Sequence, residues 1–277
     1  MIILTITTIG SFLNPIVAAT RIAASFHDYS TNKILVPDYY ADVSDAILSP
    51  EELDTLEMTM GVDDDFEAKR LGLHIDALDG EAGYSSAERR LIRPTLELTG
   101  IWGGFREEGI KTVLPSEAHV KVSFRFAKGQ DPDAVWNNFE DYIINTLAPK
   151  VAKGLTVTVQ RLSQGSRAYF IDENHIGMKL AGEVLDEVFP SARDGDGMHY
   201  NTHTTFRQGS SVSAVAYFKE VLDLDTIALG FASDADDLIH APGERFRTQS
   251  FKRSQRAYIR MIMKCSRALP EGFRNAD

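Results

Sequence analysis

The sequence has little cysteine and little positive charge. Its single cysteine, Cys265, excludes an intramolecular disulfide and a thiolate cage for zinc or an iron–sulfur cluster, and it favours a reducing, cytoplasmic compartment. The 29 Lys and Arg residues are outnumbered by 40 Asp and Glu residues, which gives a net charge of −11. A surface this acidic lacks the basic patch of a nucleic-acid-binding protein and disfavours anionic membranes. We therefore expect neither nucleic acid nor a membrane among the partners.

Long apolar runs and common catalytic motifs are also missing. Met1–Thr20 is rich in apolar residues, but no Lys or Arg precedes Arg21, and Pro15 interrupts the run below membrane-spanning length. We interpret this segment as a strand at Ile2–Thr7 and a helix that Asn14 caps. The sequence contains no P-loop, no dinucleotide fingerprint, no Gly-x-Ser-x-Gly and no His-Glu-x-x-His.

Residues 1–162 have the pattern of an α+β domain. After the first helix comes an irregular segment at about 28–94, in which Val36–Tyr40 is expected to form an extended arm. The next expected elements are strands at Thr95–Gly100 and Ala118–Phe126, a helix from Asp131 to Leu147 and a strand at Leu155–Leu162. The order β-α-arm-β-β-α-β predicts the split βαβ arrangement, an antiparallel sheet with helices on one face.

Residues 163–277 alternate amphipathic helices with one strand-like segment. The expected elements are helices at Asn174–Phe189, Ser213–Leu222 and Gln249–Leu269 and a strand at Thr226–Phe231. These are pieces of an α/β layer, but one or two strands offer little sheet on which the helices could pack. We therefore place a domain boundary near residue 162.

Two segments of this second half could carry chemistry. Arg207–Ser211 precedes a helix, where exposed backbone N–H groups could bind an anion or a developing oxyanion; the alternative is a plain capped helix start. Asp234–Glu244 combines carboxylates with His240 after a strand, which suits a metal or acid–base site; the alternative is an acidic surface loop.

Two further groups have equally open interpretations. Arg125 lies on the polar face of its predicted strand, and with Thr112 it could bind a substrate carboxylate; the alternative is a surface salt bridge. His199 and His203 are four residues apart, a spacing that could ligate zinc on a helix. The glycines of Asp194–Gly197 instead favour a flexible loop there.

Several stretches occur together in one order. They are Asn14-Pro15, Val36–Val43, Arg93–Glu97, Gly100–Phe105, Lys111–Pro115 with Gly129–Pro132, Arg207–Ser211 and Ile239–Glu244. In this order they resemble the di-zinc exopeptidases, which include cytosolic dipeptidase, carnosinase, aminoacylase, carboxypeptidase G and succinyl-diaminopimelate desuccinylase. The long segment between residues 28 and 94 is similar to the dipeptidase branch.

The resemblance implies an α/β catalytic domain interrupted by a lid that also forms a homodimer. Residues 1–162 are similar to the lid and dimerisation domain, and residues 163–277 to the C-terminal half of the catalytic domain. His240 then corresponds to a zinc ligand, in a complete site of two zinc ions that acts on a dipeptide or an N-acyl amino acid. The residues that correspond to substrate-binding positions are Thr112, Arg125, Arg207 and Ser211, of which the first two often reach the partner subunit's site.

The first catalytic half of the family has no counterpart here, and most metal ligands and the general base belong to it. One histidine cannot hold two zinc ions, because each needs about four ligands. We therefore expect a truncated member or fragment of a zinc dipeptidase-like metallopeptidase, inactive alone. The alternative is a non-catalytic dimerisation module derived from that family, which is supported by Leu4 at the position of the family's lid histidine.

Overall fold

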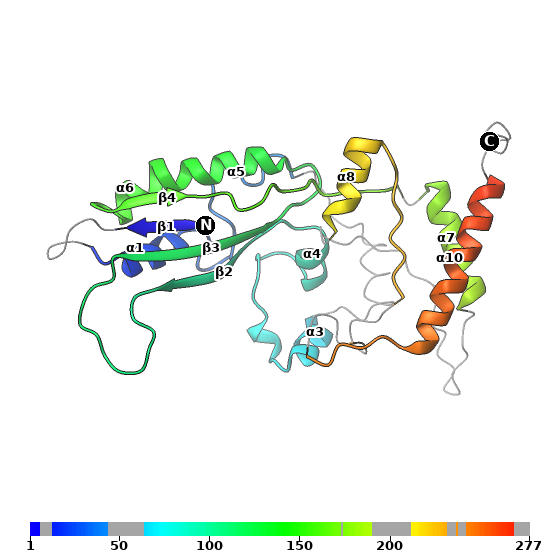
Figure 1. The fold of residues 1–277 in the computed structure, drawn as a ribbon, viewed down its shortest axis with the longest axis horizontal. Coiled ribbons are helices and arrows are strands. Elements are labelled where there is room, and N and C mark those ends of the chain that lie inside the picture. The colour runs from blue at the N-terminus through cyan, green and yellow to red at the C-terminus, as the bar shows by residue number, and fades with distance from the viewer. Residues whose placement is uncertain are drawn as a thin grey trace.

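The computed structural model describes residues 1–5, 13–43, 64–172, 174–189, 212–231, 237 and 242–268. The described elements are β1 (Ile2–Thr5), α1 (Pro15–Ala24), α3 (Asp64–Leu71), η1 (Ile75–Ala77), α4 (Ser86–Leu91), β2 (Thr95–Gly103), β3 (Glu117–Arg125), α5 (Pro132–Asp141), η2 (Tyr142–Leu147), α6 (Ala148–Val151), β4 (Thr156–Val159), α7 (Ile176–Val188), α8 (Ser213–Leu222) and α10 (Thr248–Ala268). Figure 1 shows the sheet and its helices at one end of the molecule and the pair α7 and α10 at the other.

The sheet confirms the predicted α+β arrangement. Its four strands are antiparallel in the order β2-β3-β1-β4, so that β1 pairs with both β3 and β4. Ile2, Leu96 and Val120 enter the core that the sheet shares with its helices, and each is at most 1% exposed. Burial alternates along β3, because successive side chains of a strand point to opposite faces.

The helices of this part begin and pack as their sequences predict. Asn14 accepts a hydrogen bond from the Ile16 amide at 2.9 Å at the start of α1. Asp131 caps α5 in the same way, accepting from the Asp133 amide at 2.8 Å. An apolar stripe at helical spacing continues from α5 through the π-helical η2; its members Val135, Phe139, Ile143 and Leu147 are all buried.

The extended arm predicted at Val36–Tyr40 is wrong. The chain turns there, with Asp38 at φ +55°, and Val36 and Tyr39 are 3% and 1% exposed. The Tyr39 hydroxyl donates to the Thr95 carbonyl at 2.9 Å, which fixes the turn to the sheet. Burial of the Val36 and Tyr39 side chains in the core has a lower free energy than their exposure to water, so this segment folds back onto the sheet.

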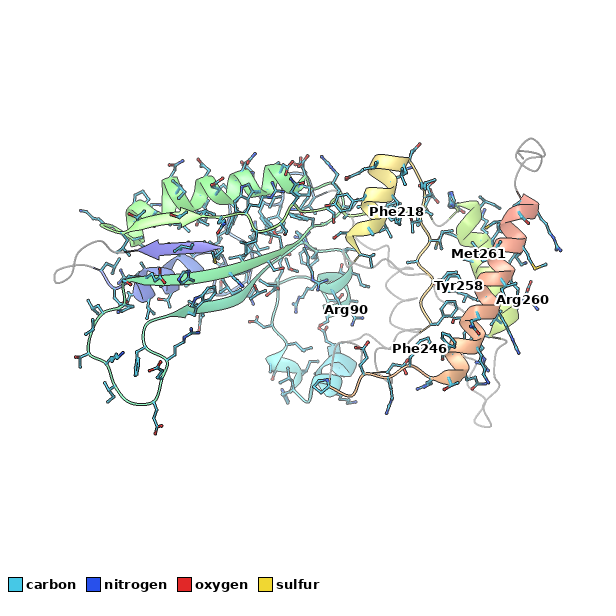
Figure 2. All side chains as sticks on the ribbon, viewed as in Figure 1. Arg90, Phe218, Phe246, Tyr258, Arg260 and Met261 are labelled. Carbon is cyan, nitrogen blue, oxygen red and sulfur yellow. The ribbon has the colours of Figure 1, made fainter. Side chains whose placement is uncertain are left out.

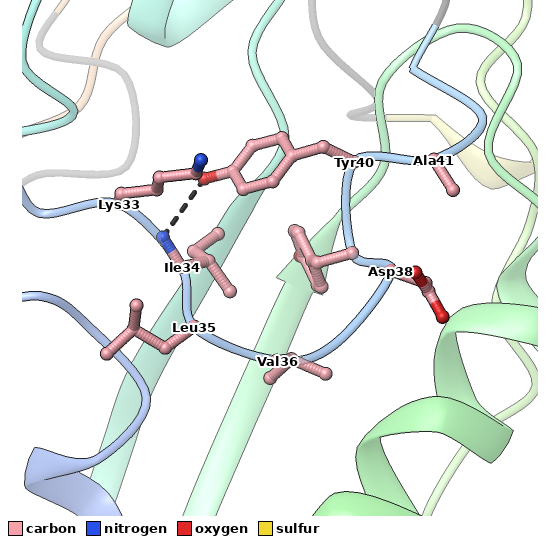
Figure 3. Close-up of a pocket in the computed structure, with 8 residues that line it drawn as sticks. Lys33, Ile34, Leu35, Val36, Asp38, Tyr40 and Ala41 are labelled. Carbon is pink, nitrogen blue, oxygen red and sulfur yellow. Dashed lines mark hydrogen bonds between the residues drawn. The ribbon is translucent and has the colours of Figure 1, made fainter.

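The same turn closes a small loop, shown in Figure 3. The Tyr40 hydroxyl accepts from the Ile34 amide at 3.0 Å and leaves a hollow inside the loop. The charged side chains that line this hollow are Lys33 and Asp38. The hollow therefore forms because the loop closes on itself, and its lining residues do not include a cluster of catalytic side chains.

Arg93 anchors residues 64–94, the rest of the segment that the sequence left irregular. Its guanidinium donates to both carboxylate oxygens of Glu81 at 2.8 Å. The rings of Tyr84 and Tyr40 lie 4.1 and 5.1 Å from the guanidinium carbon. Arg93 and Glu81 side chains are only 13% and 14% exposed. This cluster, the Arg93 clamp, connects the loop of Tyr40 to the residues before α4.

In the second part, the three predicted helices are confirmed as α7, α8 and α10. Helices α7 and α10 pack together, and Lys264 forms ion pairs with Glu183 at 2.6 Å and Glu187 at 3.0 Å.

The strand predicted at Thr226–Phe231 is wrong, because residues 223–231 have no ladder with any strand in the described ranges. Within these ranges, no helix is long and apolar enough to cross a membrane.

Candidate functional site

The β2–β3 hairpin carries both of the predicted site residues that the structure describes. Thr112 is exposed in the loop that joins the two strands, and Arg125 is exposed at the end of β3, opposite Thr95 of β2. Figure 1 shows that loop at the end of the sheet away from α8. Eight residue steps of the antiparallel strand β3 span about 27 Å at ~3.4 Å per residue. The structure therefore does not bring Thr112 and Arg125 of one chain together.

Arg125 is held on the outer face of the sheet by its two neighbours. Phe124 and Phe126 both point to the core side, with ring centroids 6.2 Å apart, and Phe124 packs edge-on against Phe139 at 4.9 Å. Strand alternation then directs the guanidinium outwards. In the part of the chain that the structure describes, no carboxylate pairs with Arg125. The surface salt bridge that was its alternative interpretation is not seen there.

The stretch Gly129–Pro132 fixes the chain just after Arg125. Gly129 adopts φ +98°. Gln130 is 2% exposed; its side chain accepts from the Ala127 amide at 2.8 Å and donates to the Tyr39 carbonyl at 2.6 Å. Asp131 then caps α5. Gly129–Pro132 is one of the stretches that resemble the family, and its role in the structure is to fix the point at which β3 ends.

The segment after β4 connects this end of the sheet to α8. Arg167 forms an ion pair with Asp131, and its Nε lies 3.9 Å from a carboxylate oxygen of Glu220 on α8. Gly165 permits the close approach, since a Cβ there would lie 2.8 Å from atoms of Phe126. Arg125 therefore lies at the end of the sheet that faces the second part of the molecule.

A second cluster lies on the open face of the sheet. The rings of Trp102 and His119 stack at 4.8 Å with an angle of 7° between their planes. Lys121 Nζ lies 5.5 Å from the Trp102 ring, and Glu117 Oε1 lies 3.3 Å from His119 Nε2. His119 and Lys121 alternate with core residues along β3, but the sequence alone did not reveal the stack. Its formation depends on the register shift of β2 between Leu98 and Gly100, which local pattern does not reveal.

The remaining predicted residues lie outside the described ranges. They are Arg207, Ser211, His240, His199 and His203. Close to His240 in sequence, Asp237 is 2% exposed, and its Oδ1 lies 3.8 Å from Arg247 Nε. Three or more His, Cys, Asp or Glu side chains do not gather as a metal site anywhere in the described part. The described residues therefore do not fit a complete metal centre, and we derive no metal-dependent step from them.

Comparison with known families gives a match that covers half of the chain. Residues 10–151 match the family profile described as the peptidase dimerisation domain. Among curated proteins, the Cys-Gly metallodipeptidase DUG1 of Candida albicans is 22% identical over 244 residues, 87% of this chain and 46% of that protein.

Solved structures share the fold along nearly the whole chain. The dipeptidase Dug1p from Saccharomyces cerevisiae superposes with a TM-score of 0.73 at 16% identity, over 95% of this chain and 53% of the yeast chain. Human carnosine dipeptidase 1 gives 0.70 at 18% identity, over 95% and 54%. The M20 family metallo-carboxypeptidase Sso-CP2 from Sulfolobus solfataricus gives 0.68 at 18% identity, over 94% and 57%. This chain spans about half the length of the relatives it matches.

Proposed function

Because the chain belongs to the peptidase dimerisation domain family, we propose that it is the lid and C-terminal part of a zinc dipeptidase-like hydrolase. Residues 1–162 are the lid and dimerisation domain, and residues 163–277 are part of the catalytic domain. The complete enzyme hydrolyses an amide bond next to a free carboxylate, in a dipeptide or an N-acyl amino acid. We expect the chain alone to be inactive, because it spans about half the length of the relatives that it matches and His240 alone cannot supply the ligands of two zinc ions.

The observation that best supports this proposal is the distance between Thr112 and Arg125 along the β2–β3 hairpin. Arg125 presents a guanidinium with no described ion-pair partner, and a planar guanidinium binds a carboxylate through two parallel hydrogen bonds. A dipeptide spans about 7 Å, much less than the ~27 Å length of β3. One substrate can therefore touch both residues only when they come from two copies. Each site of the homodimer then combines Arg125 of one protomer with the partner subunit's Thr112.

The edge of the sheet supports the homodimer. β2 is an edge strand, so one side of its backbone has no strand partner in the described sheet. Beside this edge, Leu98 and Ile101 are 46% and 50% exposed, and Val17 of α1 is 37% exposed. Pairing of two β2 edges would cover these apolar side chains and join the two sheets.

Three residues outside the described ranges complete the proposed site. His240 is a metal ligand, since imidazole is a common ligand of zinc, and two zinc ions belong to the complete site. Ser211 and Arg207 contact the substrate. A second candidate function is a dimerisation module without catalysis; Leu4 at the position of the family's lid histidine favours it.

Subunit complementation tests the shared site. The chain is combined with the half of the Candida relative that it does not match, and zinc-dependent Cys-Gly hydrolysis is measured. Arg125→Ala and Thr112→Ala should each abolish most of the rate. Mixing the two inactive variants should restore about a quarter of it, because half of the randomly paired dimers then contain one intact site. A mixture that stays inactive contradicts the shared site, and hydrolysis that is unchanged in Arg125→Ala contradicts the role of this residue.

A further inference from the structure

The loop between β2 and β3 is long and has few contacts of its own. It covers residues 104–116, whereas a usual hairpin loop has about two to five residues. Figure 2 shows it extending beyond the sheet, with side chains on both sides of the ribbon. Ile110 and Val113 are 93% and 71% exposed, and within this described stretch no backbone hydrogen bond joins two loop residues. Lys111 Nζ lies 4.6 Å from the Phe105 ring and connects the two arms. The orientation of the loop therefore depends on where it leaves the sheet.

On the core side, two glycines form the base of this loop. A Cβ at Gly103 would lie 3.0 Å from the carbonyl oxygen of Glu117, so the two ends of the loop meet closely there. Gly104 adopts φ +68°, and a Cβ at this position would lie 3.0 Å from Cδ1 of Ile16 on α1. Both glycines permit a close approach because they lack a side chain. They let the chain leave the sheet, but they supply no side chain that could fix its direction.

On the open face of the sheet, the stacked rings of Trp102 and His119 close the same base. The two residues face each other in the β2–β3 ladder, next to its last pair, Gly103 and Ala118. Their ring centroids are 4.8 Å apart, and the planes are nearly parallel. The His119 side chain is only 14% exposed, and Glu117 Oε1 lies 3.3 Å from its Nε2. The stack therefore joins the strand that enters the loop to the strand that leaves it.

The contacts of His119 indicate that its ring matters more than its second nitrogen. Nδ1 is buried and has no hydrogen-bond partner among the described residues. A buried polar atom without a partner costs free energy, so its presence calls for a compensating contact. The compensating contact is the stack, because paired rings on adjacent strands stabilise the strand pair. A phenylalanine at this position would keep the stack and remove the unpaired nitrogen.

The position of Thr112 depends on this base. Thr112 is exposed in the loop, away from the core of the sheet. In the proposed homodimer, the loop must bring it to a substrate that Arg125 of the other protomer binds. A misplacement of about 1 Å in such a site can lower the rate ~100-fold. A loop without backbone hydrogen bonds of its own meets this requirement only when its base is fixed.

We infer that the stack of Trp102 on His119 is a positioning element that sets the orientation of the β2–β3 loop and so brings Thr112 to the substrate in the partner subunit's site. The two rings do not touch the substrate, and they act on the reaction only through Thr112. This inference deepens the proposed function and rests on it, because the shared site gives the loop its task.

Spin labels measure the position of the loop in the full chain without a catalytic assay. The single cysteine, Cys265, is replaced with serine, and labels are attached at Ile110→Cys in the loop and at Asn137→Cys on the exposed side of α5. Dilution with unlabelled chain restricts double electron–electron resonance to distances within one protomer. We expect a narrow distance distribution when the stack is intact and a broad one in His119→Ala. His119→Phe should restore the narrow distribution, because a phenyl ring also stacks on Trp102.

Ser123→Ala is the matched control for these variants. Ser123 lies exposed on the same face of β3 as His119, but farther from the loop. Its replacement should leave the distance distribution unchanged. Thermal unfolding of each variant checks that the chain remains folded.

Mixed dimers distinguish a positioning role from a general loss of stability. In the complementation assay of the shared site, His119→Ala should lower the rate by about 10- to 100-fold. Its mixture with Arg125→Ala should recover activity, because one site of the mixed dimer then has an intact Arg125 and an intact loop. Its mixture with Thr112→Ala should not recover, because each site then lacks either Thr112 or a positioned loop.

Three results would overturn the inference. In the first, the distance distribution is unchanged in His119→Ala. In the second, His119→Phe gives a distribution as broad as that of His119→Ala. In the third, His119→Ala recovers activity with Thr112→Ala, or it fails to recover with Arg125→Ala although Arg125→Ala and Thr112→Ala recover together. A distribution that broadens in His119→Ala and narrows in His119→Phe, in a chain that no mixture makes active, supports the role of the stack and contradicts the proposed function.

Discussion

Replacing Arg93 with Met should strongly destabilise the sheet domain. The change removes the charge that faces Glu81 and leaves this carboxylate only 14% exposed. Removing one member of a buried ion pair costs ~3–5 kcal/mol. For the Arg93 clamp we expect the lower end of this range, about 3 kcal/mol, since neither side chain is fully buried. Loss of the contact with the Tyr84 ring at 4.1 Å adds about 0.5–1 kcal/mol.

The measurement is urea unfolding followed by circular dichroism, with the free energy of unfolding obtained by linear extrapolation. We expect a loss of about 3–4 kcal/mol for Arg93→Met. Arg93→Lys should lose about 1–2 kcal/mol, because an ammonium keeps the charge but not the two parallel hydrogen bonds. Arg90→Met is the matched control on α4: Arg90 is exposed, and its change should cost less than about 0.5 kcal/mol.

The double variant Arg93→Met with Glu81→Met decides whether the isolated charge is the cause. When both charges are replaced by apolar groups, the desolvated carboxylate disappears, so the double variant should be more stable than Arg93→Met alone. Two results would refute the reasoning. One is a loss below about 1 kcal/mol for Arg93→Met, and the other is a double variant whose loss equals the sum of both single losses.

Three further predictions use the same purified chain. Hydrogen bonds from the Ser30 and Thr31 hydroxyls and amides lower the pKa of Asp28 to about 2. This contribution to stability is complete above the unfolded pKa of ~3.9 and is lost as the pH falls through about 2. Between these values the wild type should lose stability faster than Asp28→Asn in acid-unfolding curves, and parallel curves would contradict this. Leu98→Glu should convert a dimer to a monomer in light scattering while circular dichroism shows that the chain remains folded, and an unchanged mass would contradict the β2 interface. Zinc analysis after equilibration and desalting should give fewer than two ions per chain, and two would show a metal site that the described residues do not contain.

The sequence predicted those elements that depend only on residues close to one another in the chain. Asn14 and Asp131 cap helices because each side-chain oxygen reaches an amide two residues on. The apolar stripe from Val135 to Leu147 is buried as its spacing predicts. Alternation along β3 predicted which side of the sheet Arg125 occupies.

Features that depend on distant residues were not predictable in this way. Tyr39 is buried because its hydroxyl reaches the carbonyl of Thr95, 56 residues away. Residues 223–231 have the sequence of a strand, but a strand forms only beside another. The separation of Thr112 from Arg125 follows from the length of β3 once the hairpin register is known. Of the candidate site residues, the structure therefore describes only these two.

The place of β1 in the sheet has a consequence for the order of folding. β1 is the first of the described strands, yet its neighbours β3 and β4 begin at Glu117 and Thr156. β2 and β3 are joined by one loop and can pair early, whereas β1 must wait for partners more than 100 residues away. During synthesis, the segment containing Ile2 and Ile3 therefore remains unpaired until nearly the whole first domain has left the ribosome. An apolar strand that waits this long for its partners is exposed to aggregation during synthesis.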